Sequence, residues 1–119
     1  MNAALAPHMT ACQQAAAERY FKGSASLCHA FLQAGLAQFP NDMAAIEMAL
    51  TSHDSAALRR LAHSLKTALG MLGFEAQKQR ALKLELAAFE GDWSAATMAW
   101  HSLAPDLTHL IGIGQPQAG

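Results

Sequence analysis

Residues 55–72 read SAALRRLAHSLKTALGML and carry the clearest helical pattern in the chain. Apolar residues recur here at intervals of three and four, which places them in one arc of an α-helix about 100° wide. The members of this apolar stripe are Leu58, Leu61, Ala62, Leu65, Leu69 and Leu72. A stripe of this width faces a core, so it predicts an amphipathic helix that packs against other helices.

Residues that favour helix ends divide the rest of the chain into further helices. We expect helices over 10–21, 24–50, 55–72, 74–90 and 93–111. The residues placed to cap them are Ser24 or Ser26, Asn41, Asp54 and Asp92 at the amino-terminal ends, and Gly23, Gly73 and Gly91 at the carboxyl ends. Pro40 is expected to stop or kink the second helix, with Asn41 capping a continuation through Leu50, and Pro105 to kink the last helix.

Short connections between successive amphipathic helices imply that neighbouring helices are antiparallel. The expected fold is therefore all-α, an antiparallel up-and-down four-helix bundle with an extra N-terminal helix. Residues 10–111 form this domain in the prediction, and residues 1–9 and 112–119 are expected to be flexible segments.

Composition limits the classes of function. The chain has 119 residues, of which 52% are hydrophobic and 14% charged, as expected for one globular domain. Eight Lys and Arg against nine Asp and Glu give a net charge of −1, so the protein has no overall positive electrostatic field to attract nucleic acid or an anionic membrane.

Cys12 and Cys28 are expected to be reduced core thiols. The start of the chain at Met1 is a poor signal peptide, and we expect a stand-alone cytoplasmic protein.

The side of helix 55–72 opposite the apolar stripe is basic. Its residues are Arg59, Arg60, His63, Lys66, Thr67 and Gly70, and no Asp or Glu lies between Ser55 and Phe74. Cations three and four residues from His63 favour its neutral imidazole, which is a nucleophile, and they lie within reach of a phosphoryl group carried on it. Gly70 costs roughly 1 kcal/mol relative to alanine, and it would let another protein approach the histidine closely. The alternative is a solvated face with an incidental histidine.

Residues 61–68, LAHSLKTA, followed by Gly73, resemble the motif of histidine phosphotransfer (HPt) domains. That motif is an Ala-His-x-Leu-Lys-Gly-like run with a second glycine ten residues after the histidine. The flanking order of Phe31-Leu32, Phe39-Pro40, Asp54, Leu84-Glu85 and Gly91-Asp92 also fits, and the resemblance covers about residues 27–110.

The resemblance implies a four-helix bundle in which His63 is the phosphoacceptor. The histidine would accept a phosphoryl group from an aspartate of a response-regulator receiver domain and pass it to another receiver, with Lys66 contacting the phosphoryl group. No Gly-rich phosphate loop is present, which indicates a phosphocarrier rather than a kinase. The resemblance implies no cofactor on this chain, because the receiver brings the Mg²⁺. The implied partners are a receiver domain or a hybrid sensor histidine kinase, with no nucleic acid and no membrane, and we expect a monomer.

The chain departs from the family pattern at Thr67, where glycine is common. A non-phosphorylated adaptor that binds a receiver or kinase is therefore the alternative function. A third possibility is a metal- or cofactor-binding helical enzyme, but the sequence lacks the spacing of ligand residues that would support it. Five other histidines are expected to be incidental: His8, His29, His53, His101 and His109. Glu85 and Glu90 are expected to be solvated, with an effect on receiver docking as the alternative, and Trp93 and Trp100 to lie in the core.

Overall fold

The computed structural model describes residue 16 and residues 18–114, and every regular element among these residues is a helix. An N-terminal helix ends at Phe21. It is followed by α2 (Ala25–Ser52), α3 (Ser55–Met71), α4 (Glu75–Glu90) and α5 (Trp93–Gly114). The all-α prediction is therefore confirmed for this part of the chain. The predicted helix over 10–15, the segment 1–9, Cys12 and the end of the chain after Gly114 lie outside the described residues.

Three predicted caps are present. The Ser24 hydroxyl accepts a hydrogen bond from the Leu27 amide at 3.2 Å, and Asp54 Oδ1 accepts one from the Ala57 amide at 3.1 Å. Asp92 Oδ1 accepts a hydrogen bond from an amide of α5 at 3.0 Å. Each bond satisfies one of the free N–H groups in a first helical turn, which is why these helices begin where the sequence predicts. Gly91 ends α4 with φ of 70°, a left-handed conformation that glycine accepts without strain.

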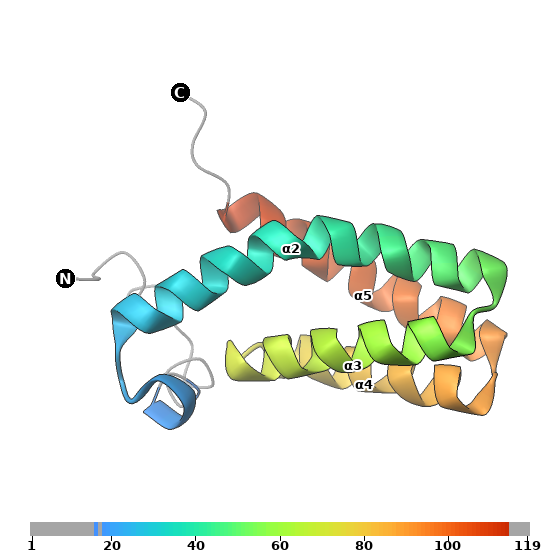
Figure 1. The fold of residues 1–119 in the computed structure, drawn as a ribbon, viewed down its shortest axis with the longest axis horizontal. Coiled ribbons are helices and arrows are strands. Elements are labelled where there is room, and N and C mark those ends of the chain that lie inside the picture. The colour runs from blue at the N-terminus through green and yellow to red at the C-terminus, as the bar shows by residue number, and fades with distance from the viewer. Residues whose placement is uncertain (1–15, 17, 115–119) are drawn as a thin grey trace.

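The prediction of a new helix start at Asn41 is wrong, because α2 runs without a break through Pro40. Proline removes one backbone hydrogen bond, and the buried side chains of Phe39 and Ile46 on either side hold the helix against the core. The ribbon of α2 changes direction near its middle, as is usual for a helix that contains proline (Figure 1). Likewise α5 continues through Pro105 and reaches Gly114, three residues beyond the expected end of the domain.

Successive helices run in opposite directions and are joined by short turns (Figure 1). The most extensive packing joins α3 to α4 and α4 to α5, and α2 packs against both α3 and α5. The apolar stripe of α3 faces the core as predicted, except that Leu61 is only half-buried. Because α3 and α4 lie side by side, the polar side of α3 lies next to side chains of α4.

A smaller apolar cluster joins the N-terminal helix to the rest of the protein. Phe21 and Cys28 are buried, and Phe31 and Met71 pack against them. The rings of Phe21 and Phe31 have centroids 5.5 Å apart. Burial raises the pKa of the Cys28 thiol above its ordinary value, in keeping with the predicted core role of this residue. The cluster holds the N-terminal helix next to the carboxyl-terminal end of α3.

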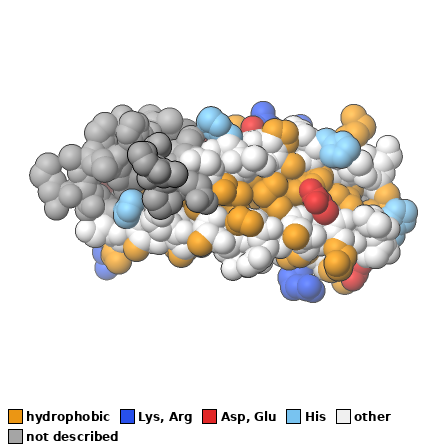
Figure 2. Space-filling model, turned by 90° about the horizontal axis from the view of Figure 1, so that it is seen from above, with side chains coloured by type: hydrophobic (Ala, Val, Ile, Leu, Met, Phe, Trp, Pro, Cys, Tyr) orange, Lys and Arg blue, Asp and Glu red, His pale blue; other side chains and the backbone are white. Residues whose placement is uncertain are grey.

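Charge is unevenly distributed over the helices. All eight Lys and Arg of the sequence lie before α2, in α3 or in α4, and neither α2 nor α5 contains any. Seen from the side of α2, the surface carries a band of hydrophobic side chains and few charges (Figure 2). Within residues 16 and 18–114, no helix combines the length and apolar character that crossing a membrane requires.

Candidate functional site

The polar side of α3 has the exposure that its sequence predicts. The side chain of His63 is 61% exposed, and Arg59, Arg60 and Thr67 are exposed as well. Lys66 is half-buried, and its side chain leans toward α4. The imidazole therefore stands open to solvent midway along α3, on the side of the helix away from the core.

An acidic residue, Glu85 of α4, lies between His63 and Lys66. Its Oε2 is 2.9 Å from Nδ1 of His63, and its Oε1 is 2.8 Å from Nζ of Lys66. The expectation of a solvated Glu85 is therefore wrong. Residues close in sequence to His63 contain no acid, and the carboxylate comes instead from the antiparallel helix, 22 residues further on. Glu85 follows the buried Leu84 in the sequence, which fits a position at the edge of the core. The sequence does not determine the register of α4 against α3, so it could not place Glu85 beside His63.

Glu85 is held in its ionised form. Burial alone would raise the pKa of this carboxyl, but the hydrogen bonds and positive charges of Lys66 and His63 outweigh burial and hold the pKa below its ordinary value. An ionised carboxylate is only an acceptor, so the imidazole donates to it through Nδ1–H. In the neutral ring the lone pair is then on Nε2. The assigned tautomer thus presents the nucleophilic nitrogen on the side away from Glu85.

An exposed aromatic side chain of α4 contacts the amino-terminal part of α3. The Arg59 guanidinium lies over the Phe89 ring, 4.6 Å from its centroid, in a cation–π contact. Phe89 is 64% exposed and Leu86, one turn before it, is 51% exposed. Single exposed apolar residues are ordinary, but two on adjacent turns of one helix are available to a docked protein.

Gly70 lies two turns after His63, and its missing side chain is used within the protein. A Cβ at this position would lie 3.0 Å from Cδ of Lys78, because the Lys78 side chain crosses the glycine. The predicted role of Gly70, to admit another protein, stays a prediction. The glycine first makes room for a lysine of α4, and any partner that approaches this end of α3 meets that lysine.

The other histidines of the described residues are all exposed, and they are His29, His53, His101 and His109. His53 stacks on Trp93 with ring centroids 4.5 Å apart, so Trp93 lies at the edge of the core, whereas Trp100 is buried as expected. His8 lies outside the described residues. No group of three His, Cys, Asp or Glu among residues 16 and 18–114 is arranged to hold a metal ion.

Comparison with known proteins identifies a family. Residues 30–111 match the family model of the Hpt domain, and this range contains His63, Lys66 and Glu85 as well as most of α2 and α5. No curated protein and no solved structure matches the chain. Hpt domains take part in histidine phosphotransfer within phosphorelays. Since the matched range is well over half of the 119 residues, the chain belongs to the Hpt domain family.

Proposed function

We propose that the protein is a phosphorelay intermediate that accepts a phosphoryl group on Nε2 of His63 from the aspartate of a response-regulator receiver domain and passes it to another receiver. The observation that carries the proposal is the pairing of Nδ1 with Glu85 on an exposed imidazole. It fixes the tautomer with a free lone pair on Nε2, in a chain that belongs to the Hpt domain family.

The transfer step needs no proton removed from the nucleophile. The Nε2 lone pair attacks the phosphorus of the aspartyl phosphate, the N–P bond forms, and the P–O bond to the aspartate breaks as the aspartate leaves as a carboxylate. The phosphorylated ring keeps its Nδ1 proton and carries a positive charge, which the Glu85 carboxylate stabilises. Attack by the carboxylate of a second receiver reverses the step and restores the neutral ring.

Lys66 has two roles in this proposal. Its ammonium neutralises Glu85, 2.8 Å away, and so limits the repulsion between that carboxylate and the incoming phosphoryl group. It also lies one helical turn from His63, where it can contact a phosphoryl oxygen. Thr67 lies exposed on the next turn as well, and its hydroxyl can donate to the same group.

The receiver docks, in the proposal, on the surface formed by the polar side of α3 and the exposed side chains of α4. Arg59 and Arg60 supply positive charge there, and Leu86 and Phe89 supply apolar area. Phosphoryl transfer of this kind depends on positioning and electrostatics, so a rigid helix is a suitable carrier.

The remaining features of the proposal follow from this role. The chain needs no cofactor of its own, because the receiver holds the Mg²⁺. We place the protein in the cytoplasm as a monomer that binds a receiver domain or a hybrid sensor kinase. The contacts of α2 with α3 and α5, together with those of α4, support an antiparallel four-helix bundle as its architecture.

The test is phosphoryl transfer from a phosphorylated receiver domain to wild-type protein and to His63→Gln, with His101→Gln as the matched control. His101 is also exposed but lies on α5, away from α3. We expect His63→Gln to take up no label and to unfold at the same urea concentration as wild type, because its side chain is mostly in water. Label on His63→Gln equal to that on His101→Gln would contradict the proposal.

The second candidate function is an adaptor that binds a receiver without being phosphorylated. Thr67 favours it, because this exposed β-branched residue stands where the family commonly has glycine. Binding of receivers to wild type without any acid-labile label would support the adaptor. Thr67→Gly would then be expected to gain phosphoryl acceptance.

A further inference from the structure

The N-terminal helix lies outside the range that matches the Hpt domain family, which begins at residue 30. It packs at the carboxyl-terminal end of α3, where the cluster of Phe21, Cys28, Phe31 and Met71 holds it. Its side chains Arg19 and Tyr20 therefore lie near Gly70, which belongs to the same helix as His63. This segment precedes the matched range and packs at one end of α3.

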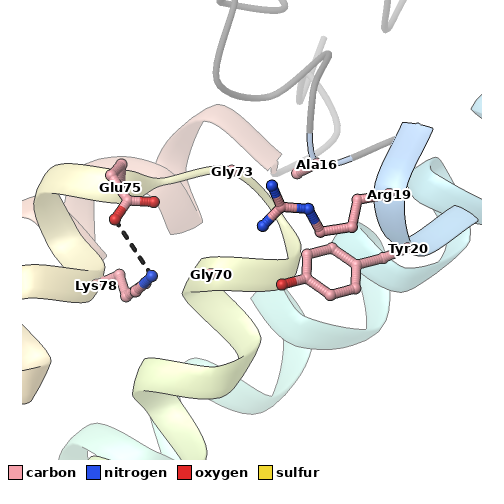
Figure 3. Close-up of a pocket in the computed structure, with 7 residues that line it drawn as sticks. All are labelled: Ala16, Arg19, Tyr20, Gly70, Gly73, Glu75 and Lys78. Atoms are coloured by element: carbon pink, nitrogen blue, oxygen red, sulfur yellow. Dashed lines mark ion pairs between the residues drawn. The ribbon is translucent and has the colours of Figure 1, made fainter.

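The N-terminal helix, α3 and α4 together form a small pocket with a volume of about 150 Å³. Its lining residues are Ala16, Arg19, Tyr20, Gly70, Gly73, Glu75 and Lys78. Arg19 and Tyr20 point into it from one side and Lys78 from the other, with the two glycines between them (Figure 3). The absence of side chains at Gly70 and Gly73 leaves the space that these longer side chains surround.

The pocket has a positive charge that is not fully compensated. Arg19 and Lys78 contribute two positive charges and Glu75 one negative charge, which leaves +1. Lys78 Nζ pairs with Glu75 at 3.2 Å, whereas the Arg19 guanidinium lies over the Tyr20 ring at 5.9 Å and has no ion pair with any described residue. A guanidinium that forms no ion pair with any described residue, next to a phenol, is suited to bind a carboxylate.

The pocket is close enough to His63 for one docked protein to cover both. Gly70 follows His63 by seven residues, which corresponds to about 10 Å along the helix axis. A protein interface of ordinary size extends well beyond that distance. An acidic side chain of a receiver engaged with His63 can therefore reach Arg19.

We propose that Arg19 and Tyr20 form, with Lys78, a specificity subsite that binds a carboxylate side chain of the receiver docked at His63. The proposal rests on the proposed function, since it names what the docked receiver must present. It makes the N-terminal helix part of the docking surface. Receivers without an acidic residue at the matching place bind more weakly.

The test measures the dissociation constant of an unphosphorylated receiver domain that binds the wild-type chain. Arg19→Ala removes the subsite charge. Lys22→Asn is the matched control, because Lys22 is exposed on the same segment but does not line the pocket, and its φ of 51° suits asparagine. We expect Arg19→Ala to weaken binding about fivefold and Lys22→Asn to change it less than about twofold. The transfer rate at saturating receiver should be the same in all three proteins, since Arg19 does not touch the reacting atoms.

Gly70→Ala provides a second variant that changes the pocket without changing its charge. The added methyl group forces Lys78 to move by a few tenths of an ångström and narrows the space, while alanine favours the helix. We expect weaker receiver binding in a protein that is more stable to urea. This combination separates a loss of the subsite from a loss of folding.

Two results overturn the proposal. The first is that Arg19→Ala binds the receiver with the same affinity as wild type. The second is that Arg19→Ala and Lys22→Asn weaken binding equally, which indicates only a general electrostatic attraction. In the first case, acetate that binds wild type but not Arg19→Ala assigns the pocket to a free anion. Failure of every receiver to phosphorylate the wild type, with the Arg19 effect on binding intact, overturns the proposed function and leaves the subsite standing.

Discussion

At the scale of single residues, the Glu85 carboxylate has contacts with both Nδ1 of His63 and Nζ of Lys66. Replacing it with glutamine keeps the shape but removes the charge, and the amide can then donate to Nδ1 and favour the wrong tautomer. We expect Glu85→Gln to transfer phosphoryl groups about tenfold more slowly at saturating receiver. Glu90→Gln, which changes an exposed residue of the same helix, is the control and should match wild type. Equal rates in the two variants would remove Glu85 from the site.

The same carboxylate makes stability depend on pH. The pKa of Glu85 is lowered in the folded protein because Lys66 and His63 outweigh the effect of burial. Such a group stabilises the fold above its unfolded pKa, about 4.3 for glutamate, and loses this contribution as the pH falls through the folded value. We expect the stability difference between wild type and Glu85→Gln to be largest near neutral pH and to disappear in acid. Urea denaturation at several pH values measures it, and a difference that does not vary with pH contradicts the assignment.

Much of the candidate site could be predicted from the sequence of α3 alone. The 3.6-residue period places Leu58 and Leu65 in the core and His63 in solvent, because both sides belong to one helix with fixed geometry. Glu85 and Lys78 could not be assigned in this way. Their positions depend on the register of α4 against α3, and the local sequence pattern of neither helix determines that register.

At the scale of the helices, the cap at Asp54 determines where α3 begins, and so where His63 stands along it. Asp54 Oδ1 accepts from the Ala57 amide at 3.1 Å, whereas Asn41, the other expected cap, lies within continuous helix. We expect Asp54→Ala to lower the free energy of unfolding by about 1 kcal/mol. Asn41→Ala should instead raise it by a few tenths of a kcal/mol, since alanine is the better helix former.

Urea denaturation of these two variants also tests the continuity of α2. An equal loss of stability in both would mean that a helix begins at Asn41 after all. The sequence predicts a break there because proline lacks the N–H of a regular helix. It does not reveal that buried Phe39 and Ile46 hold the helix together across the proline, which is a matter of tertiary packing.

At the scale of the whole molecule, the two pairs of helices differ in charge. α3 and α4 carry six of the eight Lys and Arg, Arg19 and Lys22 precede α2, and α2 and α5 have none. A chain with net charge −1 thus has a basic side that contains His63. Charge placed in this way affects the rate of association and the orientation of the docked protein more than the binding affinity. The all-α class and the family follow from the sequence, whereas this difference between the sides becomes visible only once the helices are packed.

In the proposed reaction, His63 carries the phosphoryl group on Nε2 while Glu85 holds the proton on Nδ1. The most direct measurement is an NMR spectrum of the phosphorylated, ¹⁵N-labelled protein that detects coupling between phosphorus and the histidine ring nitrogens. We expect coupling to Nε2 of His63 and a protonated Nδ1 in the same ring. Phosphorus coupled to Nδ1 of His63, or to the ring of any other histidine, would contradict it.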